Sequence, residues 1–173
     1  VRIDGTNATI ITKTPGVFLS DRNKISRVWM DHGVWPYFAV ELYTNQTGDL
    51  SLLLEKTTYF RDAQLSRAKE IDRRWDGADI LKTKNGAPYK GSIVEHILIE
   101  HLVQFFNVGP HNSIRLENAD WNDGLDMAFE KGESVALSAF YGYNLKRIAR
   151  LLGKLKETKE QQSESARQAA GYE

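Results

Sequence analysis

The sequence predicts a mainly all-α protein built from helical hairpins in series, with a short β or irregular stretch at the N-terminus. Apolar residues recur at helical spacing over much of the chain after residue 20. Glycine, proline and serine stand where helices are expected to end and begin. The 173 residues suit one domain, and a hydrophobic content of 41% is sufficient for a packed core.

The N-terminal part is expected to be extended before the helices begin. Residues 1–20 are rich in threonine, glycine and β-branched side chains, which predicts a short strand over 8–12. A turn at Pro15-Gly16 would close that strand. Pro36 suits the first turn of a helix, so a first helix is predicted over 37–46.

A second helix is expected to follow closely and to form a hairpin with the first. Gly48 is suited to the left-handed position that ends a helix, and Asp49 is suited to capping the next one. The leucine spacing that follows predicts a helix over 50–60. Residues 61–91 are mostly polar and form a long connection, which we expect to be either partly helical or functional.

The C-terminal half carries the strongest helix signals. Ser92 and Glu95 form a capping box, which predicts a helix from Ser92 that ends at Gly109-Pro110. A last helix is predicted over 134–155. The helical portion of the chain is therefore expected to be 21–155. Residues 156–173 follow as a polar tail that is either a solvated helix extension or disordered.

Charge and composition narrow the classes of function. The 23 basic and 23 acidic residues cancel, which removes the basic field that binding to nucleic acid or a membrane surface requires. The chain contains no cysteine, so disulfides and thiolate chemistry are excluded. No apolar run approaches the length of a transmembrane helix, and the N-terminus does not resemble a secretory signal. We expect a cytoplasmic protein without nucleic-acid or membrane partners.

A cluster of acids in the C-terminal half suggests acid chemistry. Asp120, Asp123 and Asp126 are spaced by three, so a helical turn would bring their carboxylates together and raise at least one pKa. A carboxylic acid that keeps its proton near neutral pH is what a general acid requires. Trp121 lies beside them and offers a platform for a sugar ring. The alternative interpretation is that these acids only cap a turn or a helix.

Metal-binding patterns are weak in this sequence. An EF-hand counted from Asp120 fails, because Gly124 comes one place early and the twelfth position is Lys131, while a non-standard calcium site stays open. His96 and Glu100 have the spacing of a metal-binding pair, but no third ligand is evident. We therefore expect no metal. Nucleotide-binding and serine-hydrolase motifs are absent from the sequence as well.

Two short stretches resemble the signature of glycoside hydrolase family 94. They are Ala119-Asp120-Trp121-Asn122-Asp123-Gly124 and, after it, Lys131-Gly132-Glu133-Ser134-Val135. Three further stretches agree with that family in order, namely residues 29–36, residues 47–49, and the pair 95–96 with 109–111. The family includes cellobiose phosphorylase and 1,2-β-oligoglucan phosphorylase. The resemblance extends over about residues 20–155.

This resemblance implies an (α/α)6 barrel and inverting phosphorolysis of β-glucosides to glucose 1-phosphate. By the family motif, Asp123 would be the general acid, and Trp121 and Asp120 would line the sugar site. Asp31, His32 and Glu133 stand at matching positions and would bind the sugar or support its site. The implied substrate is a β-glucan disaccharide or oligosaccharide, with inorganic phosphate as co-substrate. No cofactor is implied.

The chain is shorter than such a barrel, which needs on the order of 200 residues. The resemblance therefore implies a partial barrel that belongs to a larger phosphorylase, shows little or no activity by itself, and self-associates or pairs with the remaining part. Two alternatives stay open. One is a carbohydrate-binding or inverting hydrolytic helical protein, with Asp31 as the second carboxylate. The other is a non-enzymatic helical interaction module.

Overall fold

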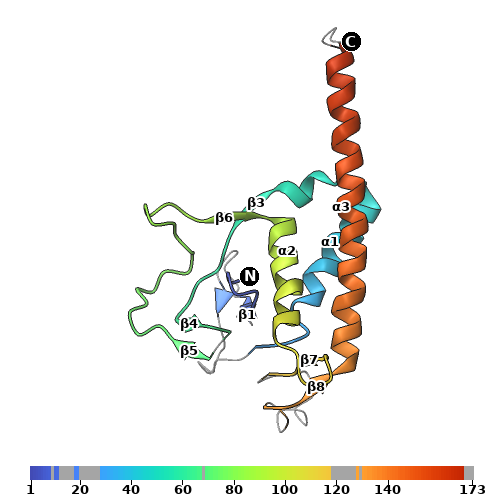
Figure 1. The fold of residues 1–173 in the computed structure, drawn as a ribbon. Helices are drawn as coiled ribbons and strands as arrows, with labels where there is room; N and C mark the ends of the chain where they lie inside the picture. Colours follow the sequence, from blue (N-terminus) through green and yellow to red (C-terminus); the bar gives the residue numbers. More distant parts are fainter. Residues whose placement is uncertain are drawn as a thin grey trace.

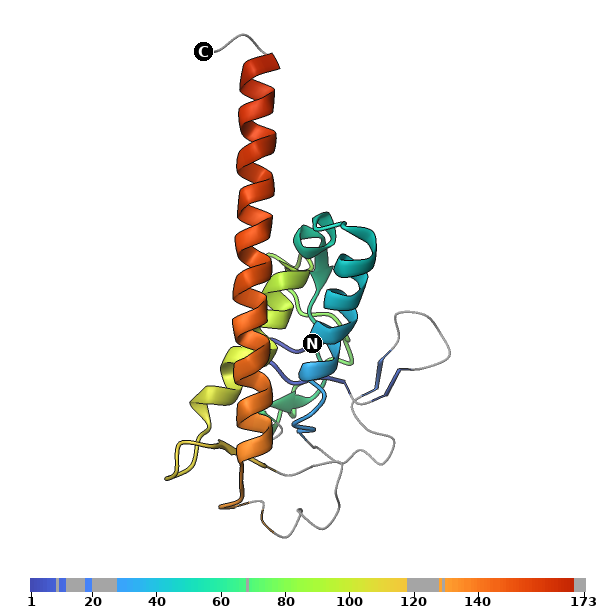
Figure 2. The same cartoon turned by 90° about the vertical axis from the view of Figure 1, so that its right-hand side faces the viewer.

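Three helices pack against one another in the computed structural model, which describes residues 1–8, 10–11, 18–19, 28–67, 69–117, 128 and 130–169. They are α1 (Val34–Thr47), α2 (Ile93–Leu102) and α3 (Val135–Ala169). Each of the three contacts the other two (Figure 1). The view turned by 90° shows α1 and α2 lying along the same half of α3 (Figure 2).

The first predicted helix, 37–46, is confirmed as the body of α1. The helix begins directly after Gly33, with Pro36 in its first turn, where its missing N–H costs no hydrogen bond. Gly48 ends it with a φ of 72°, and its N–H donates to the Thr44 carbonyl oxygen. Glycine adopts this left-handed conformation without a steric penalty, which explains why the helix ends there.

The second predicted helix, 50–60, is wrong. Residues Ser51–Leu54 form only a single 3₁₀ turn, and strand β3 (Lys56–Thr58) follows it. This strand pairs antiparallel with β6 (Lys90–Ser92), with Thr57 opposite Gly91. Two consecutive threonines are β-branched and favour an extended backbone, so a partner strand distant in sequence overrides the local leucine spacing.

The fold class predicted from the sequence, an all-α partial (α/α)6 barrel of helical hairpins, is contradicted. The described part of the chain contains three α-helices and four separate two-stranded antiparallel sheets. Besides β3 and β6, the pairs are β1 (Ile10–Ile11) with β2 (Phe18–Leu19), β4 (Gln64–Leu65) with β5 (Glu70–Ile71), and β7 (Ile114–Arg115) with β8 (Glu133–Ser134). The connection over 61–91, for which helix was one expectation, is extended and turning in its described residues.

Strands lead directly into the other two helices. Strand β6 ends at Ser92, which is also the N-cap of α2, and its hydroxyl oxygen accepts the Glu95 N–H as the capping box predicts. Strand β8 likewise runs straight into α3. The polar second half of α3 extends beyond the body formed by the other elements (Figures 1 and 2). None of the described helices has both the length and the apolar character needed to cross a membrane.

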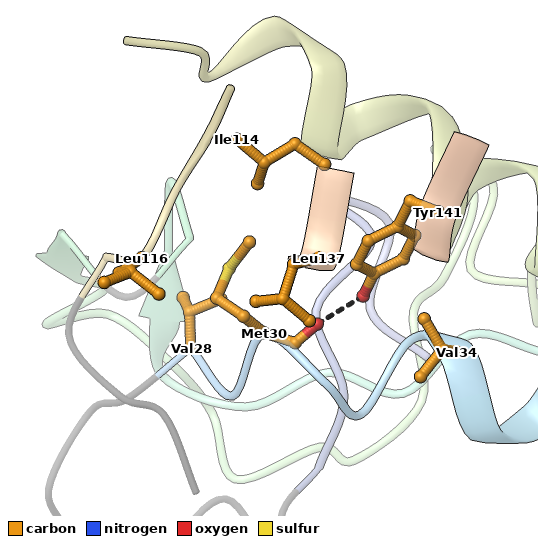
Figure 3. Close-up of a cluster of buried hydrophobic side chains, with 7 residues drawn as sticks. All are labelled: Val28, Met30, Val34, Ile114, Leu116, Leu137 and Tyr141. Carbon is orange, nitrogen blue, oxygen red and sulfur yellow. Dashed lines mark hydrogen bonds between the residues drawn. The ribbon is translucent and has the colours of Figure 1, made fainter. Parts of the chain in front are cut away.

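Two groups of buried apolar side chains hold these elements together. Tyr37, Ile97 and Ile148 form one, with a residue from each helix. The other, called here the junction cluster, joins the chain before α1 to strand β7 and the start of α3 (Figure 3). Its members are Val28, Met30, Val34, Ile114, Leu116, Leu137 and Tyr141. Each fully buried side chain of this size contributes about 1.5–3 kcal/mol to folding.

Candidate functional site

A groove of about 670 Å³ runs beside the first turns of α1. Its lining includes His32, Trp35 and Ala39 from the turn before α1 and from α1 itself, together with Phe60 and His96 from other parts of the chain. The remaining lining residues come from the N-terminal segment, from α1, from β3 and from the chain before β6, and they are Val1, Asn7, Ala8, Pro36, Thr57, Thr58, Asp79 and Ile80. A groove of this size with aromatic walls and a few polar groups is suited to a small organic ligand.

The turn that precedes α1 is fixed by buried contacts. The His32 N–H donates to the Trp29 carbonyl oxygen, and the Val34 N–H donates to that of Asp31. The Tyr141 hydroxyl donates to the Met30 carbonyl oxygen, which Figure 3 draws as a dashed line. Helix α3 therefore holds the turn that carries the predicted site residues Asp31 and His32.

Asp31 has one carboxylate oxygen engaged and one free. Its Oδ2 accepts a hydrogen bond from Trp35 Nε1 at 3.1 Å. Its Oδ1 is buried, and so is Trp29 Nε1, and neither has a hydrogen-bond partner within the described part of the chain. Because an unsatisfied buried polar atom costs about 1–3 kcal/mol, such atoms need an explanation. A sugar hydroxyl both donates and accepts, so hydroxyl groups are able to satisfy one acceptor and one donor of this kind.

The two histidines of the groove are held uncharged. His32 stacks on Trp29, with ring centroids 5.3 Å apart. Burial lowers the pKa of His32, while Asp31 acts in the opposite direction. His96 stacks on Tyr59 at 3.9 Å, and burial likewise lowers the pKa of His96. Two imidazoles that are each stacked on an aromatic ring and whose burial disfavours the charged form suit an uncharged, hydrogen-bonding ligand better than an anionic one.

Glu133 is the third predicted residue that the structure describes. It belongs to β8, and its side chain packs against the turn at residues 109–113. Its carboxylate accepts from the backbone N–H groups of His111 (3.2 Å) and Ser113 (3.1 Å) and contacts His111 Nδ1 at 3.0 Å. Desolvation raises the pKa of Glu133, but the hydrogen bonds from His111 and Ser113 outweigh it, and the pKa is lowered. A Cβ on Gly109 would overlap the Glu133 carboxyl group, so this glycine leaves room for it. Here Glu133 supports a loop, and its contact with a sugar stays a prediction.

The other predicted residues, Asp120, Trp121 and Asp123, lie outside the described residues, in the stretch 118–127, called here the acid segment. The chain on both sides of this segment is described. The Leu116 N–H donates to the Gly132 carbonyl oxygen, and Arg115 Nη1 donates to that of Glu130 at 2.7 Å. The described residues that precede and follow the acid segment are thus held together beside the β7–β8 pair.

The junction cluster brings the two sets of predicted residues into one region. Val28 and Met30 precede Asp31, while Ile114 and Leu116 lead to the acid segment, and all four pack in this one cluster (Figure 3). The turn with Asp31 and His32 and the residues just before the acid segment are therefore attached to one cluster. Residues far apart in sequence meet there because their apolar side chains are buried together.

Sequence reasoning missed a buried polar group behind this region. Glu100 and His101 of α2 and Asn144 of α3 are fully buried. Asn144 Nδ2 lies 3.2 Å from His101 Nε2, and His101 Nδ1 lies 2.8 Å from the Ile97 carbonyl oxygen, an arrangement that suits a neutral ring with its proton on Nδ1. Burial raises the pKa of Glu100 to about 8. In the sequence, the signal for this group is that Glu100 and His101 follow a run of apolar residues in the predicted helix.

The metal pair suggested by the spacing of His96 and Glu100 gains no support. No group of three or more potential ligands that could hold a metal ion occurs in the part of the chain that the structure describes. His96 instead points its Nε2 to the Thr57 carbonyl oxygen at 3.3 Å. Its ring therefore joins α2 to strand β3.

Comparison with known proteins identifies the family. A search of curated proteins found no match. The family model described as the Glycosyl hydrolase 94 superfamily, catalytic domain, matches residues 12–172, which is nearly the whole chain. The match covers the turn before α1, the groove-lining part of α1 and the acid segment alike. The chain belongs to the glycosyl hydrolase 94 superfamily, within its catalytic domain.

Proposed function

We propose that this chain forms the acid-bearing part of an inverting phosphorylase that cleaves β-glucosides with inorganic phosphate. One observation supports the proposal most strongly: Met30 and Val34, on either side of Asp31 and His32, pack in the same junction cluster as Leu116, which stands two residues before the acid segment. A general acid must lie within hydrogen-bond reach of the oxygen that it protonates. The chain belongs to a family of glycosyl hydrolase catalytic domains, so we interpret this proximity as that of a general acid and a sugar-binding site.

In the proposed reaction Asp123 supplies the proton. A phosphate oxygen forms a bond to the anomeric carbon on the face opposite the leaving group, and the bond from that carbon to the glycosidic oxygen breaks. The Asp123 carboxyl proton moves to the departing oxygen, which becomes a hydroxyl of the released sugar. The products are glucose 1-phosphate of inverted configuration and a shortened sugar. The Asp123 carboxylate then recovers its proton from solvent.

A single acid is sufficient for this chemistry. An inverting hydrolase needs a second carboxylate to activate water, whereas phosphate is already an anionic nucleophile. Asp120 lies three residues from Asp123 in the sequence. A negative charge nearby raises the pKa of a carboxylic acid, as does an approaching phosphate, and both help Asp123 to keep its proton. Trp121 would then offer its ring to the sugar.

The groove is the proposed location of the sugar. Asp31 Oδ1 and Trp29 Nε1 are unsatisfied within the described residues and complement hydroxyl groups. Trp35 keeps 54% of its surface exposed although it lines the groove, which is the state expected of an aromatic platform before a sugar ring covers it. His32 also lines the groove, and burial lowers its pKa, which favours the neutral ring that donates one hydrogen bond and accepts another.

The test is Asp123→Asn in the complete protein that carries this chain. The measured quantity is phosphate-dependent release of glucose 1-phosphate from β-glucan disaccharides of different linkage. We expect the variant to lose about 10²–10⁴-fold in kcat, the usual contribution of general acid catalysis. Asp126→Asn is the matched control: it removes the same charge three residues further on without removing the proton donor, so it should lose far less kcat than Asp123→Asn. Near-normal activity of Asp123→Asn would refute the proposal.

The same assay distinguishes hydrolysis. If free sugar appears at the same rate without phosphate, the protein is an inverting hydrolase, and a second carboxylate must act as base. Asp31 is the candidate, since its Oδ1 is unpaired among the described residues. Asp31→Asn would then abolish hydrolysis, whereas in a phosphorylase this change weakens sugar binding without removing a base.

A further inference from the structure

A buried ion pair joins the β4–β5 hairpin to the residue that immediately precedes the acid segment. Arg67, in the turn of that hairpin, donates from Nε to Glu117 Oε1 and from Nη2 to Glu117 Oε2, both at 3.0 Å. The side chains of Arg67 and Glu117 are only 13% and 6% exposed. Two parallel hydrogen bonds between a guanidinium and a carboxylate fix their relative orientation as well as their distance.

Other side chains hold the same pair in place. Asn107 Nδ2 donates to Glu117 Oε1 at 2.6 Å, and Arg67 Nη2 donates to Gln104 Oε1 at 2.9 Å. Arg67 and Glu117 both have a left-handed backbone, with φ of 56° and 57°. Residues other than glycine rarely adopt this conformation and keep it only where surrounding contacts enforce it. The ion pair and its neighbours therefore hold the backbone of Glu117 in this conformation.

The same guanidinium also reaches the turn that carries Asp31. Arg67 Nη2 lies 3.8 Å from the sulfur of Met30, the residue immediately before Asp31. One side chain thus contacts a neighbour of each predicted site segment. The chain that follows the acid segment is tied to the chain that precedes it by the Arg115 hydrogen bond to the Glu130 carbonyl oxygen.

We propose that Arg67 is a positioning residue for proton transfer from Asp123. The inference rests on the proposed function, and it adds a residue that does not itself touch the substrate. Because Glu117 is bonded directly to the acid segment, fixing its carboxylate against Arg67 fixes where that segment starts relative to Asp31. Loss of Arg67 removes the contact that orients Glu117, while the Leu116 N–H bond to the Gly132 carbonyl oxygen and the Arg115 bond to that of Glu130 remain. A displacement of about 1 Å at the reacting atoms is enough to lower a rate about 10²-fold.

The experiment measures kcat and KM separately in the complete protein for Arg67→Ala, Arg67→Lys and Glu117→Ala. Arg67→Ala should lower kcat about 10²-fold and change the KM for the disaccharide less than about threefold, because the sugar-binding groove is untouched. Arg67→Lys should fall in between, because an ammonium group does not make the two parallel bonds. Added guanidinium ion, below denaturing concentration, should partly restore kcat of Arg67→Ala only. The double variant Arg67→Ala/Glu117→Ala should lose no more than either single variant.

Two controls separate the possible outcomes. Arg147→Ala removes another arginine–carboxylate pair, in which Arg147 Nη2 lies 2.7 Å from Glu41 Oε2 between α3 and α1, and it should leave kcat unchanged. Asp123→Asn tests the proposed function itself. If Asp123→Asn is inactive but Arg67→Ala keeps its kcat, raises only KM, or loses no more than Arg147→Ala, the positioning role is refuted while the proposed function stands. If Arg67→Ala does not fold, the kcat of Arg67→Lys decides in the same way.

Discussion

Gly33→Ala tests how tightly the turn before α1 packs on α3. A Cβ at this position would lie 2.6 Å from the Tyr141 hydroxyl oxygen, 3.4 Å from the Tyr141 ring and 3.5 Å from Glu100 Cβ. Only the first distance is a clash. The φ of Gly33 is −72°, which every L-residue adopts, so the backbone adds no penalty. The cost of the substitution therefore comes from one hydroxyl group.

The size of that cost follows from what the hydroxyl does. Tyr141 is completely buried and donates to the Met30 carbonyl oxygen, so it has no free direction in which to move. Overpacking of this kind costs about 1–3 kcal/mol, and the disturbed hydrogen bond costs about 0.5–1.5 kcal/mol more. We expect Gly33→Ala to lower the free energy of unfolding by about 2–4 kcal/mol, which corresponds to about 4–16 °C in Tm for a chain of this length.

Urea denaturation followed by circular dichroism measures this loss, and two further variants make the test specific. Gly142→Ala introduces the same methyl group into open space one residue beyond Tyr141, and it should stabilise α3 by up to about 1 kcal/mol. Tyr141→Phe removes the hydroxyl, so Gly33→Ala should cost less than about 1 kcal/mol in that background. An equal loss with Phe and with Tyr at position 141 would show that the reasoning is wrong.

Three further predictions concern stability and binding. Burial raises the pKa of Glu100 from 4.5 to about 8. Between these pH values the folded protein keeps a proton that the unfolded chain releases. The contribution of this group to the free energy of unfolding is therefore fully present below pH 4.5 and is lost as the pH rises to about 8. Glu100→Gln should flatten this fall in urea midpoints measured across that range, and an unchanged slope would contradict it. Ser92→Ala removes the cap on the Glu95 N–H and should cost about 1 kcal/mol by the same denaturation assay, with no loss if the cap is unimportant. Asp31→Asn should weaken disaccharide binding about 10–100-fold in calorimetry on the complete protein, whereas unchanged affinity would exclude Asp31 from the sugar site.

The parts of the fold that the sequence predicts correctly are those set by local chemistry. Gly48 ends α1 and Ser92 begins α2 because each acts on backbone groups within the adjoining turn. The helix expected over 50–60 fails for the opposite reason. Strand β3 forms because Thr57 lies opposite Gly91, and no local pattern announces a partner so far along the chain. The predicted barrel architecture is wrong for a different reason. It was inferred from the family resemblance and not from the periodicity of these residues, whose described part contains three α-helices and four small sheets.

The candidate site divides in the same way. Asp31 and His32 were found through a motif, and the structure adds what a motif does not contain, namely that Asp31 Oδ1 lacks a partner among the described residues and that burial keeps His32 neutral. Arg67 was missed because its partner Glu117 is 50 residues away and the pairing depends on folding. A lone arginine in a polar stretch carries no signal of burial, so sequence reasoning had no means of finding it.

The precision of the proposed site depends more on its apolar neighbours than on the helices. Asp31 lies in the turn before α1 and directly follows Met30 of the junction cluster, and the acid segment follows Leu116 of the same cluster after one intervening residue, Glu117. Interior packing is close to that of an organic crystal, so a change of one side chain in such a cluster displaces its neighbours. Because Met30 and Leu116 pack in this same cluster and Tyr141 donates to the Met30 carbonyl oxygen, such a displacement acts on the residues before both segments. Substitutions in the junction cluster should therefore change sugar binding and proton transfer jointly, whereas substitutions in the cluster of Tyr37, Ile97 and Ile148 should affect stability alone.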